Sequence, residues 1–188
     1  MVNIRIITEH LELIAGTTEL VRAEIDNRLR FATLLNAQVS ENWPPPLNDI
    51  DSMEWFAHSL AENPDMVGWS VWYFVLLESV IGKRIAIGNG GFKGKPSLDG
   101  TVEIGYSLLA EFQGIGYGTE AVCGLISWAF QEKQVDRIIA ETYPELISSI
   151  RVLEKNGFVK VGKGIEEGTI CFELLRNTYA DLKKSSNL

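Results

Sequence analysis

The sequence predicts one α/β domain of the α+β kind, in which helices flank a mixed, mostly antiparallel central sheet. Three observations predict it. The chain has 188 residues, a usual size for a single domain. Hydrophobic residues make up 46% of it and charged residues 22%, as in ordinary globular proteins. Strand-like and helix-like segments follow one another without an internal repeat or a low-complexity linker. We expect the domain to span residues 1–176 and a polar tail to follow at 177–188.

The first half of the chain contains two predicted helices. A threonine at 17 or 18 opens the first helix, and apolar residues at helical spacing mark the second. Between them, Trp43-Pro44-Pro45-Pro46 must be a loop, because proline lacks the N–H that helices and central strands need. A later strand is apolar on both faces and is therefore expected in the centre of the sheet. The expected elements are strands at 2–7 and 11–14, helices at 18–28 and 49–61, and the central strand at 69–77.

In the second half of the chain, apolar and polar residues alternate more clearly. In the strand expected at 101–108, Val102, Ile104, Tyr106 and Leu108 face one side. The next helix has the strongest apolar face of the chain, and a later helix stops at a glycine. The expected elements are strands at 84–87 and 101–108, a helix from the glycines at 114–118 to about 132, a strand at 137–142, a helix at 145–156, and a strand pair at 159–161 and 169–175.

The charge balance narrows the class of partner. Lys and Arg number 17 and Asp and Glu number 25, which gives a net charge of −8. Nucleic-acid binding needs clustered positive charge, so we expect no nucleic-acid partner. A negative surface would suit a cationic partner, but it is equally a solubility feature, and we place solubility first.

Few residues of the chain suit a metal or redox site. Cys123 and Cys171 lie far apart without a CxxC motif, and we expect two buried thiols. His10 and His58 are the only histidines, so no metal site is expected. The first twenty residues lack the apolar core of a signal peptide. The longest uncharged apolar stretch, 66–77, is too short to cross a bilayer, so a cytoplasmic protein without a membrane partner is expected.

Three glycines stand between a predicted strand and the strongest helix. Gly114, Gly116 and Gly118 would let backbone N–H groups approach a ligand, and a helix start adds positive charge. Together they predict a pyrophosphate cradle, although a plain turn before a helix is the alternative. Other phosphate motifs fit poorly. The segment 90–96 lacks the spacing and hydroxyl of a Walker A motif, and the glycines come too late in the chain for a dinucleotide fold.

These residues resemble a known family. The run from Val102 to Leu108, followed by Gln113 to Ala121, is similar to the acetyl-CoA signature of the GNAT acetyltransferase superfamily. Its core, Q/R-x-x-G-x-G/A, is met by Gln113, Gly116 and Gly118. Ser148-Ser149-Ile150-Arg151-Val152-Leu153-Glu154-Lys155-Asn156-Gly157-Phe158 resembles the second motif of the family. The chain most resembles the branch that includes ribosomal-protein N-terminal acetyltransferases.

The resemblance implies where acetyl-CoA would bind. It would lie in a V between the strands at 101–108 and 137–142, with a β-bulge at Gly105 helping the strands to part. Backbone groups of Tyr106 and Leu108 would pair with the pantetheine arm. Backbone N–H groups of the loop would hold the pyrophosphate. The implied cofactor-binding residues are Tyr106, Ser107, Leu108, Gln113, Gly114, Ile115, Gly116, Tyr117, Gly118 and Thr119.

Acetyl transfer to an amine needs a base for the amine and a proton for the departing thiolate. Beside the implied acetyl group, Glu103 is the expected base, with a solvated strand carboxylate as the alternative. Ser149 is the expected acid, with a helix-cap or solvated serine as the alternative, and Tyr143 is a weaker candidate. The sequence departs from the family at two places. Leu146 stands where an asparagine is common, and Leu153 stands where many members have an acid tyrosine.

The resemblance therefore implies an N-acetyltransferase that moves acetyl directly from acetyl-CoA to a primary amine. The acceptor would be a protein or peptide N-terminus, or a small amine such as an antibiotic, polyamine or amino acid. In the related branch, the loop at Trp43 helps to wall the acceptor site, and plain packing is the alternative. A binding protein that keeps the CoA cleft without catalysis is the competing class. We expect a monomer or a homodimer.

Overall fold

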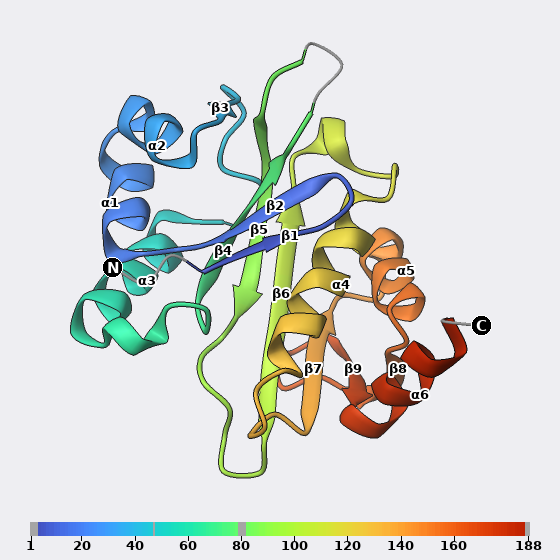
Figure 1. Ribbon diagram of the computed structural model, residues 1–188. Coiled ribbons are helices and arrows are strands. Elements are labelled where there is room, and N and C mark those ends of the chain that lie inside the picture. The colour runs from blue at the N-terminus through green and yellow to red at the C-terminus, as the bar shows by residue number, and fades with distance from the viewer. Residues whose placement is uncertain (1–3, 47, 79–81, 187–188) are drawn as a thin grey trace.

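Figure 1 shows the computed structural model of the protein, which describes residues 4–46, 48–78 and 82–186. The start of the strand expected at 2–7 and the last two residues of the expected tail lie outside this range. The strands are β1 (Arg5–Ile7), β2 (Leu11–Ala15), β3 (Gln38–Val39), β4 (Val71–Leu76), β5 (Ile85–Phe92), β6 (Thr101–Leu108), β7 (Arg137–Thr142), β8 (Val159–Lys163) and β9 (Ile170–Leu175). The helices are α1 (Thr18–Asp26), α2 (Arg28–Leu35), α3 (Ile50–Glu62), α4 (Tyr117–Ala129), α5 (Ile147–Lys155) and α6 (Arg176–Ser186), with short 3₁₀ turns η1 (Pro64–Met66) and η2 (Ala110–Phe112).

The strands form one sheet in the order β1-β2-β4-β5-β6-β7-β9-β8, and β3 pairs with β5. The pairs β3–β5 and β6–β7 are parallel and the other pairs are antiparallel. The predicted mixed, mostly antiparallel sheet is thus confirmed. The central strand expected at 69–77 is also confirmed, because every residue of β4 is buried between β2 and β5.

Helices lie on both faces of the sheet, with α1, α2 and α3 on one face and α4 on the other (Figure 1). On one face, Tyr73 and Val75 of β4 pack in a cluster with residues of α1, α2 and α3. On the other face, Trp72 and Phe74 of β4 pack in a cluster with residues of α4, β6, β7 and β9. Adjacent residues of one strand enter different clusters because side chains alternate across a sheet.

The sheet splits between β6 and β7, which pair only from Thr101–Arg137 to Glu103–Ile139. Beyond that point β6 continues beside β5, and β7 continues beside β9. The implied V between these strands is therefore present. The bulge expected at Gly105 is wrong, because the β5–β6 register runs without a shift from Phe92 to Gly88. The irregularity lies one strand away, where the β4–β5 register shifts between Phe74 and Val75.

Two helices differ from the sequence-based expectation. A second helix, α2, follows α1 immediately, because the side chain of Asn27 caps α2 while its backbone N–H ends α1. Much of the segment expected as a polar tail forms α6. There the guanidinium of Arg176 donates to the carbonyl group of Phe130, which caps the end of α4, and to that of Val135, just before β7. The ring of Tyr179 stacks on Phe130 at 4.9 Å, which holds α6 against α4.

Candidate active site

The loop before α4 presents glycines to open space. Gly114 has φ +78° and Gly116 has φ +106°, both in the left-handed region that favours glycine. A Cβ atom at either position would meet nothing within 4 Å. Gly116 also begins α4 without a side-chain cap, so no described side chain accepts from the first N–H groups of the helix. The loop therefore combines an uncapped helix start with glycines whose Cβ positions are open, as suits an anion cradle.

The structure brings the ten implied cofactor-binding residues to one place. Tyr106, Ser107 and Leu108 end β6, and the remaining residues form the loop and the first turn of α4. Gln113 and Gly118 stabilise this arrangement through contacts with Leu108. The Gln113 side chain donates from Nε2 to the carbonyl oxygen of Leu108 at 2.8 Å. A Cβ at Gly118 would lie 3.3 Å from Cδ1 of Leu108, so this glycine permits close packing of helix on strand.

A groove of about 600 Å³ begins at Gly116 and Thr119 and continues along α4. Lys155 and Asn156, at the end of α5, form another part of its lining. The Asn156 amide donates to the carbonyl oxygen of Thr119 at 3.2 Å, which joins α5 to the first turn of α4. Reasoning from the sequence missed Lys155 as a site residue, although it directly precedes the Asn-Gly-Phe end of the second motif.

Cys123 also lines this groove and is exposed, so the expectation of two buried thiols is wrong. The reason is its place on the helix. Ala121, Val122 and Leu125 form the buried face of α4, and Cys123 points elsewhere. Cys171 is partly buried, and its pKa is raised, first by burial and then by the nearby charges of Glu141 and Glu103.

The turn between β1 and β2 is fastened to the first turn of α4. One oxygen of Glu120 accepts from Thr8 Oγ1 at 2.5 Å and from the backbone N–H of His10 at 2.7 Å. The other oxygen lies 2.9 Å from Nδ1 of His10. Burial raises the pKa of Glu120, but these hydrogen bonds outweigh it and hold the pKa below its ordinary value. No local sequence pattern signals this contact, because it joins residues 110 or more positions apart.

Ser149 faces β6 across the V. The hydroxyl of Tyr106 lies 3.2 Å from Oγ of Ser149 and donates to the Ser149 carbonyl oxygen at 3.0 Å. Burial raises the pKa of Tyr106 to about 12, so its phenol stays protonated at neutral pH. Leu153 is 1% exposed and belongs to the core, which leaves no titratable group at that family position. Ser149 is therefore the α5 residue whose hydroxyl contacts β6, the strand that the family resemblance places beside acetyl-CoA.

Glu103 lies on the other face of the sheet. Its neighbours Val102 and Ile104 are buried against the α4 side, so alternation directs Glu103 to the opposite side. Its side chain is 20% exposed and forms an ion pair with Lys93. Glu103 and Ser149 thus lie on opposite faces of the sheet. A base on one side and an acid on the other suit a reaction in which an amine enters from one side and a thiolate leaves toward the other.

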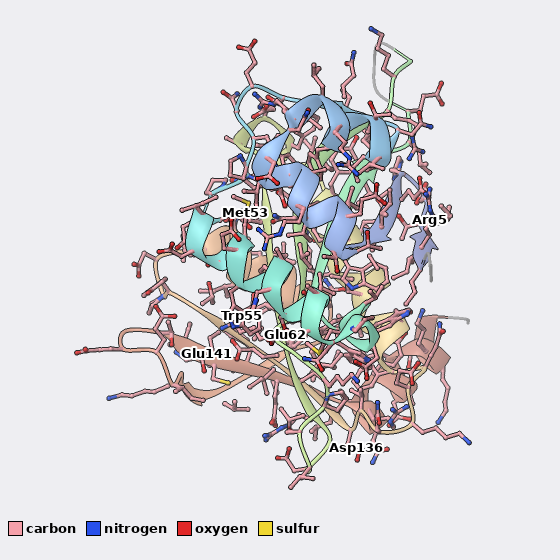
Figure 2. The ribbon with its side chains drawn as sticks, turned by 90° about the vertical axis from the view of Figure 1, so that its left-hand side faces the viewer. Arg5, Met53, Trp55, Glu62, Asp136 and Glu141 are labelled. Carbon is pink, nitrogen blue, oxygen red and sulfur yellow. The ribbon has the colours of Figure 1, made fainter. Side chains whose placement is uncertain are left out.

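Glu141 lies on the same sheet face as Glu103, in the part that α1, α2 and α3 leave uncovered (Figure 2). In that view α1, α2 and α3 occupy the upper part, and Glu141 is labelled below α3. Its carboxylate accepts from the backbone N–H groups of Ile165 and Glu166 and from Thr169 Oγ1, so it organises the β8–β9 turn. Tyr143, the weaker acid candidate, donates to Oε1 of Glu166 at 2.6 Å. This hydrogen bond raises the pKa of Tyr143.

Trp43 packs against the cluster that β4 forms with α1, α2 and α3. Its ring lies 5.5 Å from that of Phe31, and its Nε1 donates to Glu24 at 2.8 Å. The hydroxyl of Tyr73 donates to the other oxygen of Glu24 at 2.5 Å. Burial raises the pKa of Glu24, although both hydrogen bonds act to lower it. The ring of Trp43 thus takes part in packing, which is the alternative to a wall of the acceptor site.

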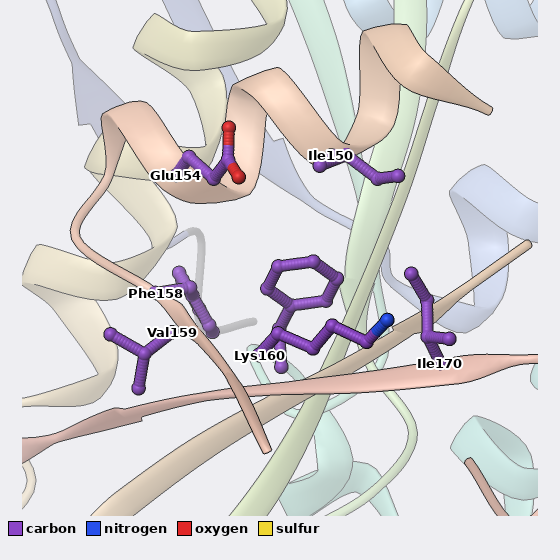
Figure 3. Close-up of a pocket in the computed structure, with 7 residues that line it drawn as sticks. Ile150, Glu154, Phe158, Val159, Lys160 and Ile170 are labelled. Atoms are coloured by element: carbon purple, nitrogen blue, oxygen red, sulfur yellow. The ribbon is translucent and has the colours of Figure 1, made fainter. Parts of the chain in front are cut away.

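A second groove, of about 460 Å³, lies between α5 and the β8–β9 pair (Figure 3). Ile150, Phe158 and Ile170 make it largely apolar, and Glu154 and Lys160 stand at its sides. It contains none of the predicted site residues. In the described part of the chain, no group of three or more His, Cys, Asp or Glu residues is arranged to hold a metal ion. No helix described has the length and apolar character needed to cross a membrane.

Comparison with known proteins gives consistent matches. The family model for the acetyltransferase (GNAT) domain matches residues 19–159. The N-acetyltransferase YjdG of Bacillus subtilis, itself uncharacterized, is 29% identical over 132 residues, which cover 70% of this chain and 76% of YjdG.

Two solved structures show the same fold. RimL, a ribosomal-protein α-N-acetyltransferase in complex with coenzyme A, matches with TM-score 0.65 and 18% identity, covering 92% of this chain and 98% of RimL. The spermidine/spermine N-acetyltransferase SpeG of Vibrio cholerae matches with TM-score 0.62 and 17% identity, covering 94% of this chain and 99% of SpeG.

Proposed function

Because the chain belongs to the GNAT acetyltransferase family, we propose that it moves the acetyl group of acetyl-CoA directly to a primary amine of a peptide or small molecule. The observation that carries the proposal is the loop at Gly114 and Gly116. It opens to free space at an uncapped helix start, beside the strand that parts from β7. RimL and SpeG act on different acceptors, a protein N-terminus and a polyamine, and both acceptors present a primary amine.

The residues present fit acetyl-CoA. In this proposal backbone N–H groups of the loop and of the first turn of α4 bind the pyrophosphate. The edge of β6 that has no partner strand beyond Glu103 pairs with the pantetheine arm through Tyr106 and Leu108. Lys155, on the groove that begins at Gly116, supplies a cation for phosphate oxygens. Asn156 beside it donates to the carbonyl oxygens of Thr119 and Val152 and so holds α5 against the first turn of α4. Acetyl-CoA itself supplies the activated thioester.

Two side chains carry the proton transfers. Glu103 accepts a proton from the incoming ammonium on the uncovered side of the sheet. Ser149 gives a proton to the leaving thiolate on the α5 side, and the Tyr106 hydroxyl beside it orients the serine. The acceptor side also carries Glu141, which favours a cationic acceptor. No step uses a covalent cysteine, because the raised pKa of Cys171 disfavours its thiolate and Cys123 lies on the groove along α4.

The test combines binding and turnover. Calorimetry measures acetyl-CoA affinity, and thiol release measures transfer to a panel of peptides, polyamines and amino acids. Glu103→Gln should lower kcat by about 10²–10⁴-fold at neutral pH. Much of the loss should return at high pH, where the amine is already neutral. Ser149→Ala should also lower kcat, without recovery at high pH. Both variants should keep the acetyl-CoA affinity of the wild type.

Glu173→Gln is the matched control, because Glu173 lies on the same sheet face with a similar exposure of 22% and pairs with Arg137. It should leave kcat nearly unchanged. Full activity of Glu103→Gln at neutral pH would exclude Glu103 as the base. Binding of acetyl-CoA without transfer to any amine would support the alternative of an inactive CoA-binding protein.

A further inference from the structure

Lys93 places its ammonium group on the carboxylate of Glu103. Nζ of Lys93 contacts Oε1 of Glu103, and the backbone N–H of Lys93 donates to the carbonyl oxygen of the same residue at 3.0 Å. Lys93 directly follows β5, so its place beside β6 is set by the sheet register. Its side chain is 60% exposed while that of Glu103 is 20% exposed. The amine therefore reaches Glu103 from the solvent side of the sheet.

A second carboxylate lies near the same amine. Glu103 pairs with Ile139 of β7, and Glu141 is two residues farther on, so both carboxylates project from one face on the two sides of the V. Burial raises the pKa of Glu141, but its hydrogen bonds and, to a smaller extent, the positive charge of Lys93 hold it below its ordinary value. The ammonium of Lys93 thus lies on the sheet face that carries Glu103 and Glu141, where β6 and β7 part.

We propose that Lys93 is an internal acceptor, which the enzyme acetylates with its own acetyl-CoA. The inference rests on the proposed function, because Glu103 acts there as the base. An acceptor amine must reach Glu103 to lose its proton, and the amine of Lys93 already contacts that carboxylate. An external amine that uses Glu103 must displace Lys93, so external acceptors compete with the internal one.

The step balances with groups already named. Glu103 takes one proton from the Lys93 ammonium, and the neutral Nζ attacks the thioester carbonyl carbon. The new N–C bond forms as the C–S bond breaks, and the nitrogen loses its second proton to water as the amide forms. The thiolate takes a proton from Ser149, which recovers one from water. Glu103 releases its proton to solvent. The products are Nε-acetyl-Lys93, free CoA thiol and one proton, and no oxidant or reductant is involved.

The experiment incubates the whole chain with acetyl-CoA and no added amine, then locates acetyl groups by peptide mapping and mass spectrometry. Lys95 is the matched control in the same molecule, because it lies two residues away and is also ion-paired, with Asp65. Lys93 should be acetylated at least tenfold faster than Lys95. The fraction modified per minute should not depend on protein concentration, since the step is intramolecular. Glu103→Gln should slow Lys93 acetylation at least tenfold and leave Lys95 unchanged.

Several results would overturn the inference. Equal modification of Lys93 and Lys95, unaffected by Glu103→Gln, would identify uncatalysed acetylation. A rate that rises with protein concentration would identify transfer between molecules. Turnover of an external amine with Lys93 unmodified would reject the internal acceptor and leave the proposed function intact. Calorimetry without acetyl-CoA binding would reject both together. In the supporting case, an external amine that is turned over should slow Lys93 acetylation.

Discussion

Gly114→Ala tests the cradle with little disturbance elsewhere. Gly114 has φ +78°, and its added Cβ would meet no atom within 4 Å, so the substitution produces backbone strain rather than a clash. An L-residue in the left-handed region costs about 1–2 kcal/mol. For a chain of this size that cost corresponds to a decrease in Tm of roughly 2–8 °C. We expect the loop to relieve this strain by changing its backbone angles, which moves its N–H groups.

The effect on binding follows from the loss of one donor. A hydrogen bond to a charged group contributes about 1.5–3 kcal/mol. If the pyrophosphate loses one such bond, acetyl-CoA affinity should decrease about 10- to 150-fold. Isothermal titration calorimetry with acetyl-CoA measures this loss, and thermal unfolding followed by circular dichroism measures the strain.

Gly82→Ala provides the control. Gly82 lies between β4 and β5, has φ +67°, and also offers open space to a Cβ, so its strain should match that at Gly114. Both variants should lose similar Tm, and only Gly114→Ala should lose affinity. Equal acetyl-CoA affinity in the two variants would refute the assignment of this loop as a phosphate cradle.

Three further predictions concern the acid, the last helix and a buried carboxylate. Tyr106→Phe removes the hydroxyl beside Ser149 and should lower kcat roughly fivefold at unchanged acetyl-CoA affinity, as expected for one hydrogen bond. An unchanged kcat in a thiol-release assay would show that the Tyr106 hydroxyl does not assist Ser149. Arg176→Met leaves the carbonyl groups of Phe130 and Val135 without their donor and should decrease the free energy of unfolding in urea by roughly 2–4 kcal/mol. The control Arg30→Met, which breaks an exposed ion pair with Glu19, should decrease it by less than about 1 kcal/mol. Glu24 has a raised pKa in the folded protein, so its contribution to stability is full below the ordinary value of 4.5 and is lost as pH rises through the raised pKa. The stability of Glu24→Gln relative to wild type should therefore increase from about pH 4.5 upward and then level off, and urea unfolding that shows a pH-independent difference would contradict this.

The parts of the fold that depend on local pattern were predictable from the sequence. The bounds of β6 agree with the alternation of its residues, and α4 begins within the glycine segment, at Tyr117. The cradle was predictable for the same reason, because Gly114 and Gly116 create it with their own backbone. In contrast α2 was not predicted, since Asn27 alone separates it from α1 and the residue pattern around Asn27 predicts a single helix that ends there.

Contacts between distant segments were not predictable. The contact of Tyr106 with Ser149 spans 43 positions and depends on how α5 returns to β6. The pairing of Lys93 with Glu103 depends on the β5–β6 register, which no residue pattern specifies. The α6 helix was expected as a tail because its composition is polar, whereas Arg176 attaches it through carbonyl groups that a sequence does not display.

The short ladder between β6 and β7 gives the sheet a hinge at one end. Backbone N–H groups of Asp136 and Arg137 both donate to the carbonyl of Gly100, which fixes that end. From Ile104 to Leu108 the free length of β6 is about 16 Å, at about 3.3 Å per residue. A small rotation at the hinge is therefore amplified at the open end, where the cradle lies. A donor lying between the two half-sheets would act as a wedge, so hydrogen–deuterium exchange should slow in β6 and β7 together when acetyl-CoA is added.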